Sequence, residues 1–142
     1  MKIAIASDHA GFALKEHLKK VLIHLSHEAI DCGTDSTESV DYPDYAARAA
    51  RALSDGECER AVLVCGSGIG MSIAANRFPR VRAALCRSVE DAEVSRRHND
   101  SNALALGERF TRAEEAERIL HAWLDTPFEG GRHVRRVEKI DS

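Results

Sequence analysis

Short apolar runs rich in β-branched residues alternate with amphipathic segments along the whole chain, and this alternation constrains the fold more than any other feature. Strands separated by helix-length segments form βαβ units, in which successive strands lie parallel in one sheet. A length of 142 residues suits one domain with its own core. We therefore expect a single α/β domain over residues 1–142, built as a three-layer α/β/α sandwich around a parallel sheet.

The apolar pattern gives an expected position for each element. We expect strands at residues 2–7, 28–32, 60–65, 81–86 and 103–107, and helices at 13–25, 44–53, 70–76, 88–97, 111–124 and about 131–140. Thr111, followed three residues later by Glu114, matches a capping box and predicts a helix start at Thr111. The last helix has too little apolar surface to be stable alone, so we expect it to pack on something else.

The charge balance argues against a nucleic-acid partner. Twenty Lys and Arg oppose 23 Asp and Glu, for a net charge of −3, whereas binding to nucleic acid needs a strongly basic face. No apolar run approaches the ~18 residues of a membrane span, and Asp8 stands where a signal peptide would be apolar. We expect a cytoplasmic protein with no membrane partner.

Four cysteines, Cys32, Cys58, Cys65 and Cys86, are scattered along the chain without CxxC pairing. We expect neither a disulfide framework nor a metal site, since there is no secretory signal and no histidine at finger spacing. Cys32, Cys58 and Cys86 are interpreted as small hydrophobic residues. Cys65 differs, because it ends a strand directly before a glycine-rich turn and a helix, where the positive helix end favours a thiolate. It is a candidate base or nucleophile.

The ligand site of an open parallel sheet lies beyond the carboxyl ends of its strands. Residues 7–11 (SDHAG), 65–70 (CGSGIG) and 107–109 (GER) follow three of the expected strands. The glycine-rich segment can expose several backbone N–H groups as an anion cradle, although it lacks the lysine of a nucleotide P-loop. A tight corner between strand and helix is the alternative explanation of its glycines.

Three further side chains are candidates for a site. His98 ends a polar helix among hydrogen-bond donors and acceptors and could act as an acid or base, although a solvated surface histidine fits equally well. Arg132 and Arg136 are four residues apart, so a helix would present them on one face, able to close on a single phosphate. A solvated basic face is the alternative.

Five segments taken together closely resemble the ribose-5-phosphate isomerase type B family. They are residues 7–12 (SDHAGF), 41–43 (DYP), 65–76 (CGSGIGMSIAAN), 97–100 (RHND) and 129–133 (EGGRH). The resemblance spans nearly the whole chain in the right order. It implies a Rossmann-like sheet of five parallel strands and a homodimer or dimer of dimers with sites at the subunit interface, where the last helix packs on a partner subunit. It also implies a cofactor-free and metal-free isomerisation of ribose 5-phosphate to ribulose 5-phosphate through a cis-enediolate.

The resemblance also implies roles for individual residues. Cys65 would be the base that moves a proton between C1 and C2 of the opened sugar, and His98 would open the ring. Ser67, where the family often has threonine, would assist proton transfer at the sugar oxygens. An anion hole for the enediolate would consist of the backbone amides of Gly66, Gly68, Ile69 and Gly70. Some members use a glutamate instead of the cysteine, and the presence of Cys65 favours the cysteine type.

The remaining implied roles concern substrate binding. Asp8 and Asn99 would hold sugar hydroxyls. The phosphate would be bound by His9, Arg132 and Arg136, with Arg109 as a third arginine.

Two other functions fit the sequence. The first is the same chemistry on allose 6-phosphate, galactose 6-phosphate or a four-carbon ketose phosphate, because pocket changes discriminate among such sugars by only ~1–3 kcal/mol. The second is a phosphosugar- or nucleotide-binding module without catalysis, which would have no use for Cys65 and His98. A flavin carrier is disfavoured, since one Trp, two Tyr and four Phe leave little to stack on a flavin.

Overall fold

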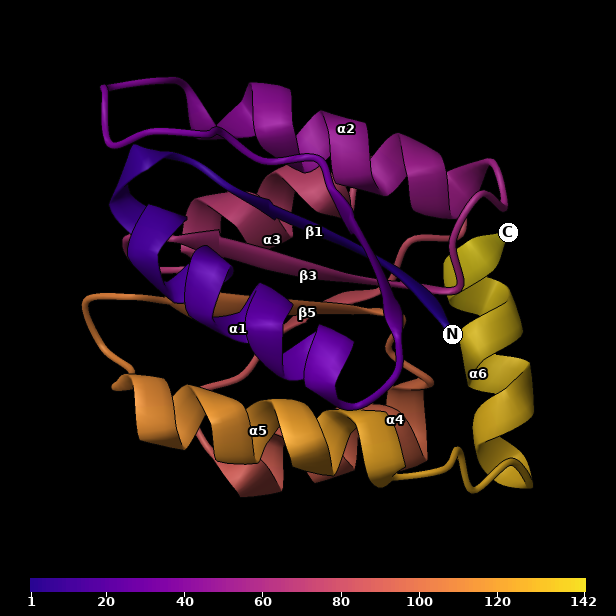
Figure 1. Ribbon diagram of the computed structural model, residues 1–142. Coiled ribbons are helices and arrows are strands. Elements are labelled where there is room, and N and C mark those ends of the chain that lie inside the picture. The colour runs from indigo at the N-terminus through magenta and orange to yellow at the C-terminus, as the bar shows by residue number, and fades with distance from the viewer.

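The computed structural model describes residues 1–142 and contains one sheet of five parallel strands flanked by helices (Figure 1). The strands are β1 (Lys2–Ser7), β2 (Glu28–Asp31), β3 (Arg60–Cys65), β4 (Ala83–Leu85) and β5 (Ala103–Gly107). The helices are the short 3-10 turn η1 (His9–Gly11), α1 (Phe12–His24), α2 (Tyr42–Ser54), α3 (Ile69–Ala75), α4 (Val89–Asn99), α5 (Ala113–Asp125) and α6 (Arg132–Asp141). The expected α/β class and five-stranded parallel sheet are confirmed.

The order of the strands fixes where a ligand site can form. That order is β2-β1-β3-β5-β4, so the chain moves outward from β1 to β2 and then returns past β1 to β3. The direction of strand addition therefore reverses between β1 and β3, which is the position where open α/β sheets bind ligands. Ser7 pairs with Val64 across these two strands, so Asp8 and Cys65 leave the sheet next to each other.

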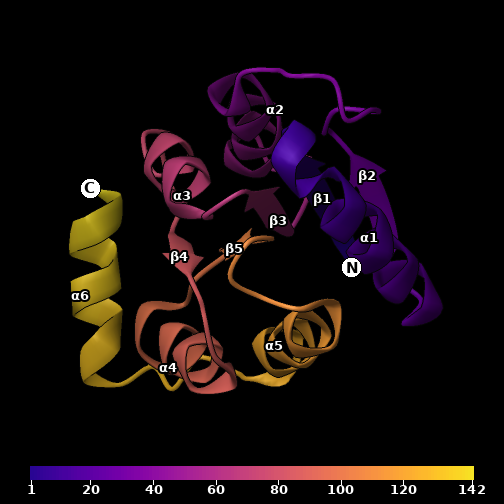
Figure 2. The same cartoon turned by 90° about the vertical axis from the view of Figure 1, so that its left-hand side faces the viewer.

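Two cores of different character lie on the two faces of the sheet (Figure 2). On the face covered by α1, α4 and α5, the strands contribute Ile3, Ile5, Val62, Val64, Leu104 and Leu106. On the face covered by α2 and α3, β1 contributes Ala4 and Ala6, which face the buried Ala46, Ala49 and Ala50 of α2. Small side chains on both partners let α2 pack close to β1.

The C-terminal helix α6 stands at the β4 edge of the sheet and packs in part on α4 (Figure 2). It buries only His133 and Val137, and an ion pair of 2.7 Å between Arg82 and Asp141 holds its end. The expectation of a helix with little apolar surface is confirmed. No helix of the chain combines the length and the apolar character that crossing a membrane requires.

The element boundaries differ from the expected ones by at most two residues at either end. The second helix begins at Tyr42 rather than residue 44, because Pro43 fits the first turn, where its missing N–H has no partner to lose. The fourth strand is shorter than expected and spans only Ala83–Leu85.

The predicted capping box at Thr111 is wrong. The helix α5 begins at Ala113 with Arg112 as its N-cap, and no side chain caps it. The N–H of Thr111 donates instead to the carbonyl of Gly107 at 3.1 Å, so Thr111 belongs to the turn after β5. Its hydroxyl is buried without a hydrogen-bond partner.

We predict opposite effects for two substitutions at helix starts. Ser88→Ala removes a real cap, since Ser88 Oγ accepts from the Asp91 N–H at 3.0 Å, and should lower the free energy of unfolding by about 1 kcal/mol. Thr111→Val removes an unpaired buried hydroxyl and should leave that free energy unchanged or raise it by up to about 1 kcal/mol. Urea unfolding of both variants measures the difference. A loss at Thr111 as large as at Ser88 would restore the capping role.

Candidate active site

A hollow of about 440 Å³ opens at the carboxyl ends of β1 and β3. Its walls include Asp8, His9, Tyr42, Cys65, Ser67 and Arg109. Five of these six residues are among the sequence-predicted site residues, and they come from the turns after three different strands. The structure therefore brings the expected base, Cys65, and two of the expected phosphate-binding residues, His9 and Arg109, together within one chain.

The turn after β3 directs a backbone amide at the sulfur of Cys65. The Gly68 N–H donates to Cys65 Sγ at 3.1 Å, and this donor stabilises negative charge on the sulfur. Gly68 has a φ of +79°, and a Cβ there would lie 2.8 Å from the carbonyl carbon of Leu106. Only glycine fits this position, so the hydrogen bond to the sulfur depends on it.

The other amides of the same turn differ in their availability. The Ile69 N–H donates to Ser67 Oγ at 3.2 Å, and the Gly68 N–H is engaged by the sulfur. The amides of Gly66 and Gly70 donate to no group of the chain. Of the four amides expected in an anion hole, two are therefore free in this structure and two already have side-chain partners.

Asp8 and His9 are fixed by backbone groups. Asp8, 6% exposed, accepts the Gly11 N–H on Oδ1 at 3.1 Å, which leaves its second oxygen for a ligand. His9 accepts the Val40 N–H on Nδ1 at 3.1 Å. A neutral His9 must then carry its proton on Nε2, so its side chain acts as a donor at the wall of the hollow.

Arg109 is held against the turn that carries Cys65. The N–H groups of Glu108 and Arg109 donate to the carbonyls of Cys65 and Gly66, both at 3.0 Å. The guanidinium covers Gly66 so closely that a Cβ there would lie 3.1 Å from Arg109 Cζ. The Glu108 carboxylate in turn accepts the Leu14 N–H at 2.7 Å, which joins this turn to the start of α1.

The sequence assigns no site role to two residues that support the hollow, Tyr42, which belongs to the family segment 41–43, and Lys15. Tyr42 lines the hollow and packs so tightly on Gly70 that a Cβ at Gly70 would lie 2.5 Å from the Tyr42 ring.

Lys15 is only 1% exposed and donates to Asp31 at 2.9 Å and to the carbonyl of Thr34 at 2.7 Å. These bonds hold the segment that leads to Val40, the partner of His9. A lysine on the buried leucine stripe of α1 was the signal available for it.

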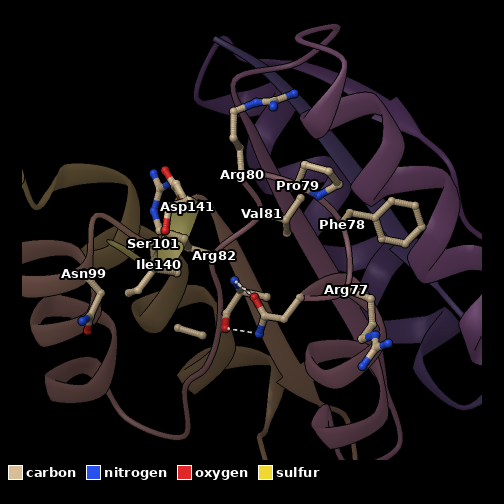
Figure 3. Close-up of a pocket in the computed structure, with 14 residues that line it drawn as sticks. Arg77, Phe78, Pro79, Arg80, Val81, Arg82, Asn99, Ser101, Ile140 and Asp141 are labelled. Carbon is tan, nitrogen blue, oxygen red and sulfur yellow. Dashed lines mark hydrogen bonds and ion pairs between the residues drawn. The ribbon is translucent and has the colours of Figure 1, made fainter. Parts of the chain in front are cut away.

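Four other predicted site residues, His98, Asn99, Arg132 and Arg136, lie away from the carboxyl ends of the strands. His98 and Asn99 end α4 and precede the amino end of β5, whereas Cys65 is the last residue of β3, at the carboxyl end of the strands. The five residues of β5 alone span roughly 16 Å, so His98 cannot meet Cys65 of the same chain. Figure 3 shows Asn99 at the rim of a cavity of about 670 Å³, away from the hollow that contains Cys65.

Arg132 and Arg136 occupy successive turns of α6, as expected. Both side chains are exposed, and neither forms an ion pair with an acidic residue of the chain. Two unpaired guanidinium groups on one helical face are available for an anion from outside the chain.

One group of side chains has the composition of a metal site. Donor atoms of His98, Glu129 and His133 lie within 4.8 Å of one another. The two imidazoles are stacked, however, with an angle of 12° between their planes. Ring-nitrogen lone pairs lie in the ring plane, so two parallel rings cannot both point at one ion. A metal would bind here only after one ring left the stack.

The four cysteines are all free thiols in different surroundings. Burial raises the pKa of the Cys32 and Cys58 thiols, and it raises the pKa of Cys86 to about 11. Cys58 and Cys86 are buried as expected, whereas Cys32 is half-buried. These three thiols hold their protons more tightly than an ordinary cysteine, while Cys65 alone lies in the hollow with an amide on its sulfur.

The chain is similar in sequence and in structure to known proteins. The sequence model described as Ribose/Galactose Isomerase matches residues 3–140. The chain is 48% identical to ribose-5-phosphate isomerase B of Escherichia coli, covering 98% of this chain and 93% of that protein. It is 40% identical to D-erythrulose-4-phosphate isomerase of Pectobacterium atrosepticum, covering 99% and 93%. The solved structure of Clostridium thermocellum ribose-5-phosphate isomerase B superimposes with a TM-score of 0.98 at 49% identity, covering 99% and 95%.

We predict that Cys65 is the first cysteine to react with iodoacetamide at about pH 7.5. The thiolate is the reacting form, and the Gly68 N–H stabilises negative charge on the Cys65 sulfur. Peptide mapping by mass spectrometry at short times gives the order of labelling. Cys86 should be the last to react, since its thiol is 1% exposed with a pKa of about 11. Labelling of the half-buried Cys32 before Cys65 would contradict the assignment.

Proposed function

The chain belongs to the ribose/galactose isomerase family, and from this premise we propose that it interconverts ribose 5-phosphate and ribulose 5-phosphate with Cys65 as the base. The resemblance noted in the sequence is thereby confirmed at the level of the family. The observation that carries the assignment of the base is the Gly68 N–H on Cys65 Sγ, at the wall of a hollow that also contains unpaired backbone amides.

The arrangement supports a proton transfer between neighbouring carbons. The Cys65 thiolate takes the C2 proton of the open aldose, and the electron pair moves onto the C1 carbonyl oxygen to give the enediolate. The proton of the C2 hydroxyl is then transferred to the C1 oxygen, and the thiol returns its proton to C1 as the electron pair on the C2 oxygen forms the ketone. Free amides at Gly66 and Gly70 are suited to the negative oxygen of the enediolate, where a single donor contributes ~3–4 kcal/mol to transition-state stabilisation. Ser67 lies beside Cys65 and assists the proton transfers at the sugar oxygens.

A binding module without catalysis is less well supported. Such a module needs the free amides and the cations but gains nothing from a thiolate beside them. The relatives that cover almost the whole chain bear the names of isomerases. Catalysis accounts for Cys65 and binding alone does not.

The site is completed, in our proposal, by a second copy of the chain. His98 and Asn99 lie before the amino end of β5, away from Cys65, so one chain contains two incomplete halves of a site. Ile69 and Ile73 of α3 are 44% and 63% exposed beside the hollow, and Val134 of α6 is 41% exposed. A second copy that covers these apolar side chains would bring its own His98 over Cys65, and a two-fold contact of this kind forms two equal sites.

The binding residues divide between the two copies in the same way. His9, through Nε2–H, and Arg109 approach the phosphate from the chain that provides Cys65. Arg132 and Arg136 approach it from α6 of the other copy, which explains why a weakly packed helix carries two unpaired cations. The free oxygen of Asp8 and the amide of Asn99 hold sugar hydroxyls.

The four-carbon substrate is the second candidate, because one relative at 40% identity is named D-erythrulose-4-phosphate isomerase. A comparison of kcat/KM for ribose 5-phosphate, allose 6-phosphate and erythrulose 4-phosphate decides between them. We expect ribose 5-phosphate to give the highest value. A cytoplasmic location, where sugar phosphates are metabolised, belongs to the same proposal.

We predict that Cys65→Ala abolishes isomerisation of ribose 5-phosphate while Cys86→Ala leaves most of it. Both changes remove one buried thiol, so they form a matched pair for stability. Only Cys65 lies in the hollow, because Cys86 is packed in the core on the α1 side of the sheet. Steady-state kinetics with both variants measures the effect. Equal activity in the two would exclude Cys65 as the base.

We also predict that two inactive variants restore activity when their chains are mixed. Cys65→Ala retains His98, and His98→Asn retains Cys65, so a mixed dimer contains one complete site. Random exchange of subunits should give about a quarter of the wild-type activity, since half of the dimers carry one intact site of two. The control is each variant alone after the same unfolding and refolding. Activity that stays at background in the mixture would show that both residues act from one chain.

A further inference from the structure

The imidazole ring of His133 stacks on the imidazole ring of His98. The ring centroids are 4.4 Å apart and the ring planes differ by 12°, so the two imidazoles are stacked face to face. His133 is 8% exposed, whereas its neighbours Arg132 and Val134 on α6 are exposed. The helix therefore turns one polar ring inward, at the place where it meets the end of α4.

The segment before α6 is built to deliver His133 to this position. The Glu129 N–H donates to the carbonyl of Arg97 at 3.1 Å, which anchors the segment to the residue before His98. The carboxylate lies between two cations or potential cations, 3.8 Å from Arg97 Nε and 3.7 Å from His133 Nε2. Gly130 and Gly131 then reverse the chain with φ values of +70° and +57°, which other residues rarely adopt.

The end of α4 is equally constrained. Asp100 adopts the left-handed conformation, with a φ of +46°, directly after α4. Its carboxylate accepts from the buried Arg96 at 2.8 Å, and Arg96 also donates to the carbonyl of Ser101 at 2.6 Å. The backbone at His98 is thus fixed, and the orientation of its ring is the freedom that remains. The contact with His133 limits that freedom.

We propose that His133 is a positioning residue that holds the His98 ring in the orientation required to open the sugar ring. This inference rests on the proposed function and on the role of His98 within it. In ring opening, His98 gives a proton to the ring oxygen O4, and the C1–O4 bond breaks with its electron pair moving to O4. The C1 hydroxyl gives its proton to water, and C1 becomes the aldehyde carbon. A donor that is free to rotate meets O4 less often than one held on a flat surface.

The charges around the stack favour this division of roles. Burial lowers the pKa of His133, and the neighbouring His98 lowers it further. Glu129 acts in the opposite direction, while Arg132 and Arg136 also lower it. The lowered pKa favours a neutral His133, and a neutral ring can stack on His98 without repulsion between two cations.

The experiment compares His133→Ala, which removes the flat surface, with His133→Phe, which keeps a flat ring but no polar atom. His24→Ala, at an exposed histidine in the last turn of α1, is the control for loss of a histidine. Two rates are measured for each dimeric protein: conversion of ribose 5-phosphate, which is a closed ring, and exchange of the C1 hydrogen of ribulose 5-phosphate with deuterated water. Ribulose 5-phosphate has no ring, because its O5 carries the phosphate, and its exchange requires only the base and the anion hole.

We expect His133→Ala to lower kcat for ribose 5-phosphate by about ten- to a hundredfold, with exchange into ribulose 5-phosphate changed less than about threefold. His133→Phe should recover most of the conversion, and His24→Ala should match the wild type in both rates. Equal loss of conversion and exchange in His133→Ala, or no loss in either, would overturn the positioning role. A wild-type protein that neither converts nor exchanges these sugars would instead overturn the proposed function.

Discussion

The backbone contact between the turn after β3 and the turn after β5 underlies the rest of the site. No side chain separates the two turns at this point: a Cβ at Gly107 would lie 2.5 Å from the carbonyl carbon of Ser67, and one at Gly68 would lie 2.8 Å from that of Leu106. Two hydrogen bonds of 3.0 Å join the same turns. The direction of the Gly68 N–H toward Cys65 follows from this contact, and so does the seat of the Arg109 guanidinium. A methyl group at either glycine would separate the turns and move Cys65 away from the Gly68 amide.

Much of the fold and half of the site could be predicted from the sequence, because both are encoded locally. The strands alternate large and small apolar residues, which predicts their positions. The residues that follow the strands meet at the carboxyl end of the sheet, which predicts where a site can form. Asp8, His9, Cys65 and Arg109 were found in this way, and the structure gathers them around one hollow. The local pattern gave a wrong prediction at Thr111, whose hydroxyl and spacing to Glu114 suit an N-cap. The Thr111 N–H instead donates to the Gly107 carbonyl, so Thr111 belongs to the turn after β5.

Other features depend on contacts between distant segments and leave little trace in the sequence. Lys15 looks like one of many charged residues of an amphipathic helix, yet its ammonium group is buried against Asp31 and Thr34. The stack of His98 on His133 joins residues 35 positions apart through a turn of two glycines, and its parallel geometry also distinguishes it from a metal site. The sequence does not show how the candidate residues are divided in space. The structure places one group at the carboxyl ends of the strands and the other on α4 and α6.

The shallow packing of α6 affects the order in which segments of the protein unfold. A helix of ten residues that buries two side chains and is held by one ion pair at its end belongs to the least stable end of the range of local opening. Cys65 and its turn, in contrast, are bonded to the central strands β3 and β5. In a single chain, thermal fluctuation would therefore release the arginines of α6 and expose His98, while Cys65 and the amide on its sulfur remain in place. In the proposed dimer, the rigid sheet would therefore hold Cys65 in place, and the second half of the site would become ordered only when the subunits associate.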